Sequence, residues 1–300
     1  MILCCGEALI DMLPRTTQGD EPAFAPYAGG AVFNTAIALG RLGAPSGYFG
    51  GLSTDLFGGL LANSLDQSRV DAGLCPRSAR PTTLAFVTLT NGHAQYAFYD
   101  EGTAGRMLGT DDLPDLSADT DALFFGGISL VSEPAADTYA ALCTREAGQR
   151  VIMMDPNIRP SFITDEASYR ARLMAMLACA DIVKVSDEDL DWIGGGIEGL
   201  LARGVHLVVM TKGAEGAEAH TPAGSTRVPA TPATVVDTVG AGDTFNAGLL
   251  AGLHRDGLLT RSALRTASLQ ALHPALRLGA QAAAITVSRA GANPPWDHEL

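Results

Sequence analysis

A glycine-rich segment in the C-terminal third of the chain has the residue types of an anion-binding loop. Residues 237–246 read Asp-Thr-Val-Gly-Ala-Gly-Asp-Thr-Phe-Asn. They lie between an apolar run at 233–236, which we expect to end a strand, and a helical pattern that begins near Asp243. Gly240 and Gly242 therefore precede N–H groups that have no partner within the helix. Because glycine has no Cβ atom, a phosphate can approach these groups closely, and the loop predicts an anion hole.

Asp243 has two interpretations. Aspartate is favoured in the first turn of a helix as a cap and as a partner of the helix dipole, so a structural role is open. However, a carboxylate beside a phosphate site repels the phosphate, which indicates that it does other work there. Removing a proton from an attacking hydroxyl is such work, and it is the task of a general base in phosphoryl transfer.

Two other glycine loops are excluded by the residues around them. A dinucleotide-binding fingerprint requires a third small residue at position 245, where this chain has Phe245. A Walker A loop requires Gly-Lys followed by Ser or Thr, and neither Lys184 nor Lys212 follows a glycine. The loop therefore binds its anion in some other way.

Residues 237–245 resemble the C-terminal signature of the ribokinase-like (phosphofructokinase-B-type) sugar kinases, and Gly-Gly-Ala-Val-Phe-Asn at 29–34 resembles their N-terminal one. Within that family the chain is most similar to bacterial fructokinases, essentially from end to end. The resemblance implies ATP-dependent phosphorylation of a sugar hydroxyl, first of all that of D-fructose, with Asp243 as the base. It also implies that the loop around Gly240, Ala241 and Gly242 stabilises the transferring phosphoryl group, with Mg²⁺ and a possible K⁺ as ions.

The predicted sugar side lies near the N-terminus. Asp11 follows an apolar run at 2–10, which we expect to form the first buried strand, at the end where open α/β sheets bind ligands. The Gly29–Gly30 pair opens a helix, and the amide of Asn34 in its first turn offers donors and acceptors to a polyol. Each of these residues also has an ordinary structural interpretation. The resemblance implies sugar binding by Asp11, Gly29, Gly30, Asn34, Arg106, Arg159 and Asp243.

Residues 155–160, Asp-Pro-Asn-Ile-Arg-Pro, follow another short strand, and two prolines stiffen the loop around Arg159. This loop resembles that of both fructokinases and ketodeoxygluconate kinases, so 2-keto-3-deoxygluconate is an alternative acceptor. An acid sugar requires two or more convergent cations beyond those that serve ATP. Lys212 is assigned to the nucleotide, and Lys184 is expected to point along its own strand. Only Arg106 and Arg159 remain, which favours neutral fructose.

Further strand ends carry the predicted nucleotide and ion contacts. The glycines after Thr211 allow a nucleotide to approach, and the segment at 186–189 stands where the family has an Asn-x-x-Glu magnesium and phosphate motif. Its acids are also suited to be helix caps. The resemblance implies nucleotide contacts by Ser186, Thr211, Lys212, Gly213, Gly216, Gly240, Gly242 and Asn293. It also implies metal contacts by Asp189 through water, and by Asp237 and Val239 in a monovalent-cation loop.

The elements that position these residues indicate an α/β fold. Short apolar strands at 123–125, 151–154, 182–185 and 205–210 alternate with helical segments, which predicts a doubly wound, mostly parallel sheet with helices on both faces. Apolar, β-branched runs flank Asn91–Gly92, a hairpin signal that interrupts this alternation. We therefore expect one ribokinase-like domain over residues 1–300, with a projecting β lid formed from about 12–28 and 82–104.

The composition and net charge disfavour some classes of binding partner. The formal net charge of −13 disfavours nucleic acid and anionic membranes. The five cysteines form no Cys-x-x-Cys pair, and the N-terminal residues lack a basic region before a long apolar core, so we expect a cytoplasmic protein. The expected partners are a small sugar and ATP. An apolar lid is also able to pair with a second lid in a homodimer.

Other functions remain open at this point. A nucleoside kinase of the same family would share the phosphate residues and differ in the acceptor pocket. A hydrolase is disfavoured because the chain has no Gly-x-Ser-x-Gly elbow and no His-Glu-x-x-His helix. A catalytically silent sugar sensor is compatible with the fold, although a pure sensor has no need for Asp243 as a base.

Overall fold

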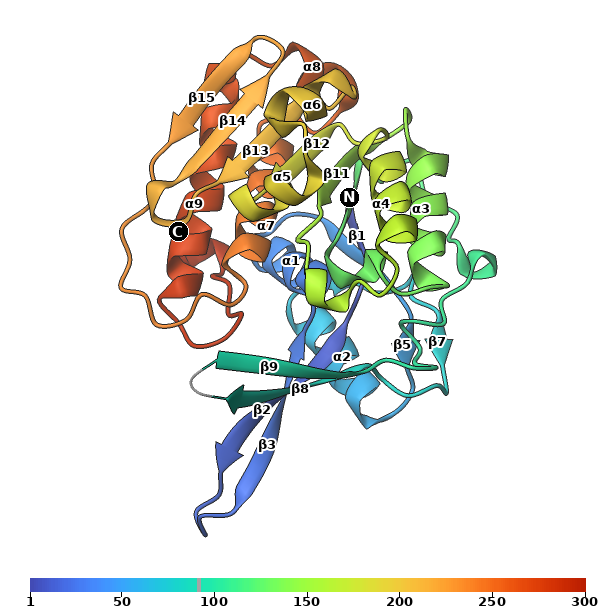
Figure 1. Cartoon of the computed structure of the whole chain (residues 1–300). Coiled ribbons are helices and arrows are strands. Elements are labelled where there is room, and N and C mark those ends of the chain that lie inside the picture. The colour runs from blue at the N-terminus through green and yellow to red at the C-terminus, as the bar shows by residue number, and fades with distance from the viewer. Residues whose placement is uncertain (91–92) are drawn as a thin grey trace.

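Short, buried strands build the central sheet of the protein. The computed structural model describes residues 1–90 and 93–300, so the expected turn at Asn91–Gly92 lies outside the described residues (Figure 1). The central sheet has nine strands in the order β15-β14-β13-β12-β11-β10-β1-β4-β6. Neighbours from β6 to β13 pair in parallel, and β14 and β15 are antiparallel, which confirms the predicted mostly parallel sheet. The strands are β1 (Ile2–Cys5), β4 (Ser46–Phe49), β6 (Val70–Asp71), β10 (Ala122–Gly126), β11 (Val151–Asp155), β12 (Ile182–Val185), β13 (Leu207–Thr211), β14 (Ala217–Thr221) and β15 (Gly224–Val228).

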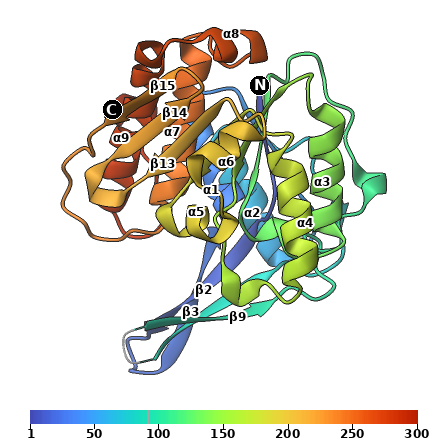
Figure 2. The ribbon, with the colours of Figure 1, turned by 45° about the horizontal axis from the view of Figure 1, so that its top comes forward.

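Helices cover both faces of this sheet (Figure 2). Successive residues of a strand point to opposite faces, so Ile2 and Cys4 pack in one core with α1, α7 and α9, and Leu3 and Cys5 pack in the other with α3 and α4. No helix in the described part of the chain is long and apolar enough to cross a membrane. The helices are α1 (Ala31–Arg41), α2 (Leu56–Gln67), α3 (Ala135–Glu146), α4 (Glu166–Leu177), α5 (Asp187–Ile193), α6 (Gly196–Ala202), α7 (Ala241–Arg255), α8 (Arg261–Thr266) and α9 (His273–Val287).

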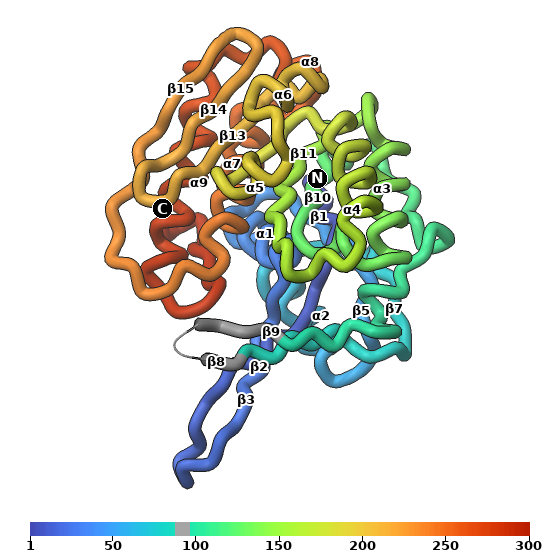
Figure 3. Tube along the Cα trace, viewed as in Figure 1, coloured from blue at the N-terminus to red at the C-terminus, as the bar shows by residue number. Residues whose placement is uncertain are grey.

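A second, four-stranded sheet extends from the body, and the chain trace shows it reaching away from the helices (Figure 3). Its order is β3-β2-β8-β9, so the predicted hairpin pairs outside the central sheet, as expected. The prolines of β3 are tolerated because β3 is an edge strand. Its strands are β2 (Leu9–Thr16), β3 (Pro22–Gly29), β8 (Leu84–Thr90) and β9 (His93–Tyr99); β5 (Leu52–Ser53) and β7 (Arg77–Ser78) form a separate pair. We call the four-stranded sheet the lid sheet.

The expected single strand over residues 2–10 is wrong. The run divides after Cys5, and its second part begins the lid sheet, so Asp11 does not end a strand of the central sheet. The break occurs at Glu7, whose carboxylate turns toward the start of α1 and accepts a hydrogen bond from the N–H of Ala31 at 2.7 Å. Apolar residues lie on both sides of Glu7, so the run looks continuous in the sequence and gives no sign of this break.

The expected strand end at residues 233–236 is also wrong, because this segment is irregular. Val235 and Val236 are 64% and 62% exposed. The N–H of Val236 donates to the carbonyl of Val287 at 2.7 Å, so the segment is held by the end of α9 and not by a sheet. Its apolar, β-branched composition favoured a strand, but the segment pairs with no strand in the described part of the chain.

Helices α7 and α9 pack backbone to backbone through glycines. A Cβ atom at position 248 of α7 would lie 2.6 Å from the Cα of Gly279 in α9. Gly252, one turn further along α7, has the backbone of Ala275 against it in the same way. Only glycine permits so close an approach. The contact fixes α7, the helix that begins at the predicted anion loop, against the rest of the body.

We predict that Gly248→Ala lowers the free energy of unfolding by about 1–3 kcal/mol, the usual cost of overpacking a tight contact. Gly59→Ala in α2 is the matched control, because nothing lies within 4 Å of a Cβ atom at that position. The control should gain up to about 1 kcal/mol from its higher helix propensity. Urea unfolding of both variants measures the difference, and equal midpoints would contradict the packing argument.

Candidate active site

The N-termini of α1 and α7 meet, and this contact brings the two predicted signatures together. The side-chain amide of Asn34 donates to Oδ2 of Asp243 at 2.9 Å. The hydroxyl of Thr35 donates to the backbone carbonyl of Asp243 at 3.3 Å. The structure thus places the predicted base beside a predicted sugar-binding residue, although 209 positions separate Asn34 from Asp243 in the sequence.

Asp243 is in an environment suited to a base near neutral pH. Its residue surface is only 8% exposed. Burial raises the pKa of Asp243 to about 7, even though the hydrogen bond from Asn34 and the charge of Lys184 act in the opposite direction. A carboxylate with such a pKa is a stronger base than an ordinary aspartate, and its pKa lies near the working pH, which is the favoured range for a general base. Helix capping alone does not require burial of the carboxylate.

The glycine loop leaves backbone donors free. Gly240 has a left-handed conformation with φ of 76°, and a Cβ atom there would lie 2.7 Å from Cβ of Ala292. No side chain caps the start of α7. Within the described part of the chain, the N–H groups of Gly242 and Asp243 have no hydrogen-bond partner. Two free N–H groups at the start of a helix attract an anion.

Lys184 lies beside this loop, and the expectation that it points along its own strand is wrong. Its residue surface is 6% exposed, and its Nζ would be 3.3 Å from a Cβ atom at position 242. Burial opposes its charge, but Asp155 first and then Asp189 and Asp243 outweigh this effect and raise the pKa of Lys184. The side chain therefore provides a buried ammonium group next to the predicted anion hole.

A buried acid and amide hold Lys184 in place. Oδ2 of Asp155 accepts from Nζ of Lys184 at 3.0 Å and from the amide of Asn246 at 2.7 Å. Oδ1 of Asp155 and Oδ1 of Asn246 are buried without a hydrogen-bond partner in the described part of the chain. A lysine within an otherwise apolar, buried strand was the sequence signal for this group, because a buried lysine needs a paired acid.

On the sugar side, Asp11 lies against the glycine pair. The register of the lid sheet pairs Asp11 with Tyr27 and Leu9 with Gly29. A Cβ atom at Gly29 would collide with Oδ2 of Asp11, and Gly30 has φ of 109°. Burial raises the pKa of Asp11 to about 6, so the group is mainly ionised at pH 7 and accepts hydrogen bonds. The structure therefore gathers Asp11, Gly29 and Gly30 at the start of α1.

Glu7 fixes this end of α1 and was not identified from the sequence. Its Oε1 accepts from the N–H of Ala31, and its Oε2 accepts from the N–H of Ser129 at 3.3 Å. Ser129 belongs to a short 3₁₀ turn, Gly127–Leu130. Burial raises the pKa of Glu7, against the lowering effect of these hydrogen bonds. The residue ties α1 to the turn after β10, where Ile128 faces a cavity.

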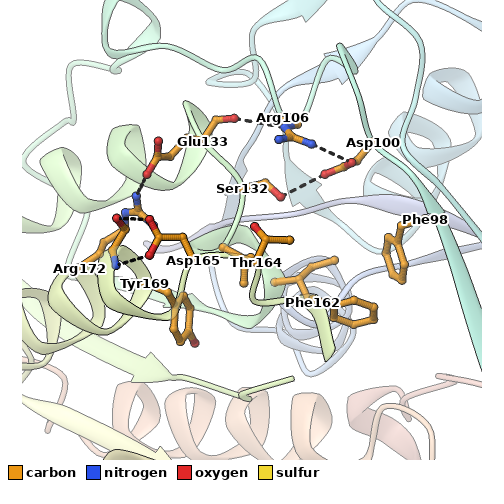
Figure 4. Close-up of a pocket in the computed structure, with 13 residues that line it drawn as sticks. Phe98, Asp100, Arg106, Ser132, Glu133, Phe162, Thr164, Asp165, Tyr169 and Arg172 are labelled. Atoms are coloured by element: carbon orange, nitrogen blue, oxygen red, sulfur yellow. Dashed lines mark hydrogen bonds and ion pairs between the residues drawn. The ribbon is translucent and has the colours of Figure 1, made fainter. Parts of the chain in front are cut away.

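The two predicted arginines lie in different surroundings. Arg106 lines a cavity of about 330 Å³ together with Phe98 and Arg172, and Nη1 of Arg106 is 3.0 Å from Oδ1 of Asp100 (Figure 4). Arg159 is exposed, and its guanidinium donates to the carbonyl of Ile158 at 3.1 Å. The structure does not bring the two guanidinium groups together at one cavity.

The residues predicted for the nucleotide are mostly engaged with neighbouring groups. Nζ of Lys212 is 3.0 Å from Oε1 of Glu218, and the hydroxyl of Thr211 donates to the carbonyl of Val185 at 3.4 Å. Gly213 and Gly216 have positive φ angles of 52° and 100°, which the turn between β13 and β14 requires. Ser186 forms a reciprocal capping box at the start of α5. Asn293 accepts a hydrogen bond from Arg41 at 2.8 Å.

The predicted ion contacts also have structural partners. Asp189 accepts from the N–H of Ile158 at 2.7 Å and from the N–H of Ser186 at 3.0 Å, so its two oxygens hold the Arg159 loop and cap α5. Asp237 accepts from the N–H of Val239 at 3.0 Å and from that of Gly291 at 2.9 Å. No group of three or more histidine, cysteine, aspartate or glutamate residues in the described part is arranged to hold a metal ion.

Comparisons with known proteins agree with this geometry. A fructokinase of Rhizobium leguminosarum bv. trifolii is 58% identical over 278 residues, which cover 91% of this chain and 85% of that protein. The structure of a Xylella fastidiosa fructokinase with bound ATP has a TM-score of 0.89 at 30% identity and covers 97% and 93% of the two chains. A Vibrio cholerae O395 fructokinase with fructose, ADP and calcium ion bound has a TM-score of 0.82 at 26% identity and covers 97% and 94%.

The sequence also matches the model of a whole family, described as pfkB family carbohydrate kinase, over residues 1–299. The match includes both glycine signatures, the helices that carry them and the lid sheet. The helix junction of Asn34 and Asp243 therefore belongs to a sugar kinase. This chain is a member of the pfkB family of carbohydrate kinases.

Proposed function

We propose that the protein transfers the γ-phosphoryl group of ATP to a hydroxyl of D-fructose. The observation that carries the proposal is the position of Asp243: a buried carboxylate, 2.9 Å from the amide of Asn34 and directly after a glycine loop with free N–H groups. The choice of fructose is supported by the fructokinase relative with 58% identity. A sugar-sensing protein without catalysis has no use for a carboxyl group whose pKa is held near 7.

In this mechanism the residues divide between proton transfer and charge stabilisation. Asp243 takes the proton of the attacking hydroxyl, and Asn34 fixes its carboxylate. The N–H groups of Gly242 and Asp243 and the ammonium group of Lys184 stabilise negative charge on the transferring phosphoryl group. These groups are fixed before substrates bind, so little reorganisation is required during the reaction. Positioning and electrostatics thus provide the catalysis.

The sugar lies, in this proposal, between the start of α1 and the lid sheet. Asp11 and Asn34 hold its hydroxyl groups, and the Gly29–Gly30 pair allows it to approach the backbone. Arg159 approaches from the loop after β11 as the lid sheet closes. The acid-sugar alternative loses support, because Arg106 is paired with Asp100 and Arg159 stands alone as the remaining predicted cation.

On the nucleotide side, we propose that Lys212, Thr211 and the turn at Gly213 and Gly216 line the ATP site. Asn293 and Ser186 then contact it from either side. Relatives bind ATP or ADP, in one case with a calcium ion. Because the described residues contain no group of three or more metal-ligating side chains, a Mg²⁺ ion here would keep waters and ATP oxygens as most of its ligands, with Asp189 reached through water. When bound, this ion would screen the phosphate charges. K⁺ near Asp237 and Val239 and a cytoplasmic location stay predictions.

The lid sheet also offers a surface for a second copy of the chain. On the face opposite Asp11, the rings of Phe24, Phe86 and Tyr99 contact one another edge to face, with centroid distances of 5.0 and 5.5 Å. Phe24 and Tyr99 remain 42% and 61% exposed. An aromatic row on a projecting sheet buries well against an identical row, so we propose a homodimer through this face.

The proposal predicts that the native enzyme has its highest kcat/KM with fructose among fructose, ribose, adenosine and 2-keto-3-deoxygluconate.

The first prediction for a variant concerns Asp243. Asp243→Asn keeps the size of the side chain but removes the base, so kcat should fall by roughly 10²–10⁴-fold with a small change in KM for fructose. For the native enzyme, kcat/KM should fall as the pH drops below about 7, where Asp243 becomes protonated. Near-normal turnover of the variant would leave Asp243 as a cap only.

Thermal stability provides a control for Asp243→Asn, because the change that lowers activity should raise stability above neutral pH. Because the folded-state pKa of Asp243 is raised from 3.8 to about 7, the folded protein binds a proton that the unfolded chain has lost. This group therefore lowers stability progressively as the pH rises from about 4 to about 7. Asp243→Asn should raise the Tm at pH 8 and leave it nearly unchanged at pH 4. A lower Tm at pH 8 would show that loss of activity reflects damage to the fold.

A second prediction addresses the anion hole. Gly242→Ala places a methyl group 3.3 Å from Nζ of Lys184, within the loop that carries the free N–H groups. We expect kcat/KM for ATP to fall by about 10- to 1000-fold, the range for loss of one oxyanion donor, with fructose binding retained. Steady-state kinetics with each substrate varied in turn make this distinction. Unchanged kcat and KM for ATP would show that the loop and Lys184 do not form the phosphate site.

A third prediction tests the dimer. Phe24→Lys should raise the dimer dissociation constant at least about tenfold, because a charge replaces an aromatic anchor. Ala23→Lys, on the other face of the same strand, is the matched control and should leave association unchanged. Sedimentation equilibrium at several protein concentrations gives both constants. A native protein that stays monomeric at every concentration would disprove the proposed interface.

A further inference from the structure

The cavity beside the lid sheet is rich in charge, but its two guanidinium groups are already paired with carboxylates. Two guanidinium groups, of Arg106 and Arg172, and three carboxylates line it (Figure 4). Arg172 is bound by Glu133 and Asp137, the latter at 2.9 Å, and also donates to the carbonyl of Leu130. Because Arg172 is fully engaged and only 8% exposed, it offers no cation to a ligand in this cavity. Arg106 is the remaining guanidinium in its lining.

Arg106 is bound on one side by Asp100. Nη1 of Arg106 lies 3.0 Å from Oδ1 of Asp100, and its Nε donates to the carbonyl of Glu133 at 3.2 Å. The other oxygen of Asp100 accepts from the hydroxyl of Ser132 at 3.1 Å, which fixes the carboxylate. The side chains of Arg106 and Asp100 are 34% and 26% exposed, so a ligand in the cavity can reach both.

This cavity adjoins the proposed sugar site. Across the lid sheet, Asp11 pairs with Ala85 and Ala85 pairs with Phe98, so all three side chains share one face. Two strand spacings place Phe98 about 10 Å from Asp11. Phe98 lines the cavity with Arg106, and a smaller neighbouring cavity of about 50 Å³ shares Phe98, Asp100 and Arg106 and extends to Leu9 beside Gly29. A sugar held by Asp11 therefore has its far end toward Arg106.

We infer that Asp100 is a specificity-determining residue, which neutralises Arg106 and so excludes acceptors that carry a carboxylate. A sugar acid has to displace Asp100 from Arg106 and leave that carboxylate beside its own, and this repulsion selects against it. A neutral sugar meets no such cost and finds Asp100 and Arg106 as hydrogen-bond partners. The inference rests on the proposed sugar kinase function and names the residue pair that sets its acceptor class.

The test compares two variants that remove one negative charge from the same cavity. Asp100→Asn frees Arg106, whereas Asp165→Asn changes a carboxylate that caps α4 through Ser168 and is not paired with Arg106. We expect Asp100→Asn to raise kcat/KM for 2-keto-3-deoxygluconate relative to fructose by about 10- to 100-fold, the value of a new hydrogen bond to a charged group. Asp165→Asn should change this ratio less than about threefold.

Further variants separate the explanations. Asp100→Ser removes the same charge with a smaller side chain and should reproduce the gain, which guards against a folding defect in one variant. Adding Arg106→Gln to Asp100→Asn should abolish the gain. D-gluconate should inhibit fructose phosphorylation more strongly in Asp100→Asn than in the native enzyme, whereas neutral glucitol should not.

The outcomes distinguish this inference from the proposed function. If the native enzyme phosphorylates fructose but neither Asp100 variant improves use of the acid sugar, the inference is overturned. An equal gain in Asp165→Asn would also overturn it, because total charge and not the pairing of Arg106 would then be responsible. If the native enzyme phosphorylates no sugar, the proposed function fails instead.

Discussion

Burial of one carboxylate at the junction of two helix N-termini is the constraint on which the site depends. Asp243 lies in the first turn of α7 and accepts a hydrogen bond from Asn34 of α1, so the two helices have to keep a fixed relative position for the proposed base to keep its orientation. Backbone contact between α7 and α9 secures one helix. Glu7 secures the other through the N–H of Ala31. In the proposed mechanism, contacts outside the site thereby control the alignment of Asp243 and Asn34.

The proposed phosphate site gains its positive charge from Lys184, a group that is itself stabilised by a neighbouring negative charge. Lys184 remains charged in the interior because Asp155 is 3.0 Å away, and Asn246 fixes Asp155 in turn. Removal of Lys184 or of Asp155 would leave the other as an uncompensated buried charge, which lowers the stability of the fold. The carboxylates of Asp155 and Asp243 and the ammonium group of Lys184 thus form one electrostatic unit. In this unit the pKa of Asp243, the proposed base, and the charge of Lys184 beside the proposed anion hole depend on each other.

Much of this architecture could be predicted from the sequence, because its signals are local. Gly-Ala-Gly-Asp before a helical pattern predicts a helix N-terminus at Asp243, and alternating apolar strands predict the parallel sheet. The contacts of Lys184 and Glu7 were not predicted, because each side chain binds a partner that is distant in sequence, whereas the periodicity of apolar residues describes only near neighbours. Asp11 was recognised but placed in the wrong sheet, since the apolar run continues across the break at Glu7. The pairing of Arg106 with Asp100 depends on a turn whose geometry has no repeating pattern.

The short segment from Gly6 to Ala8 joins the central sheet to the lid sheet, and the bound carboxylate of Glu7 makes it a fixed pivot. At about 3.3 Å per residue, Asp11 lies about 13 Å from this pivot, and Thr16 at the far end of β2 lies about 30 Å from it. Any rotation of the lid sheet about the pivot therefore displaces its tip more than twice as far as Asp11. In the proposed function, a movement of the lid sheet therefore shifts the proposed sugar-binding residue Asp11 less than half as far as the tip of the sheet.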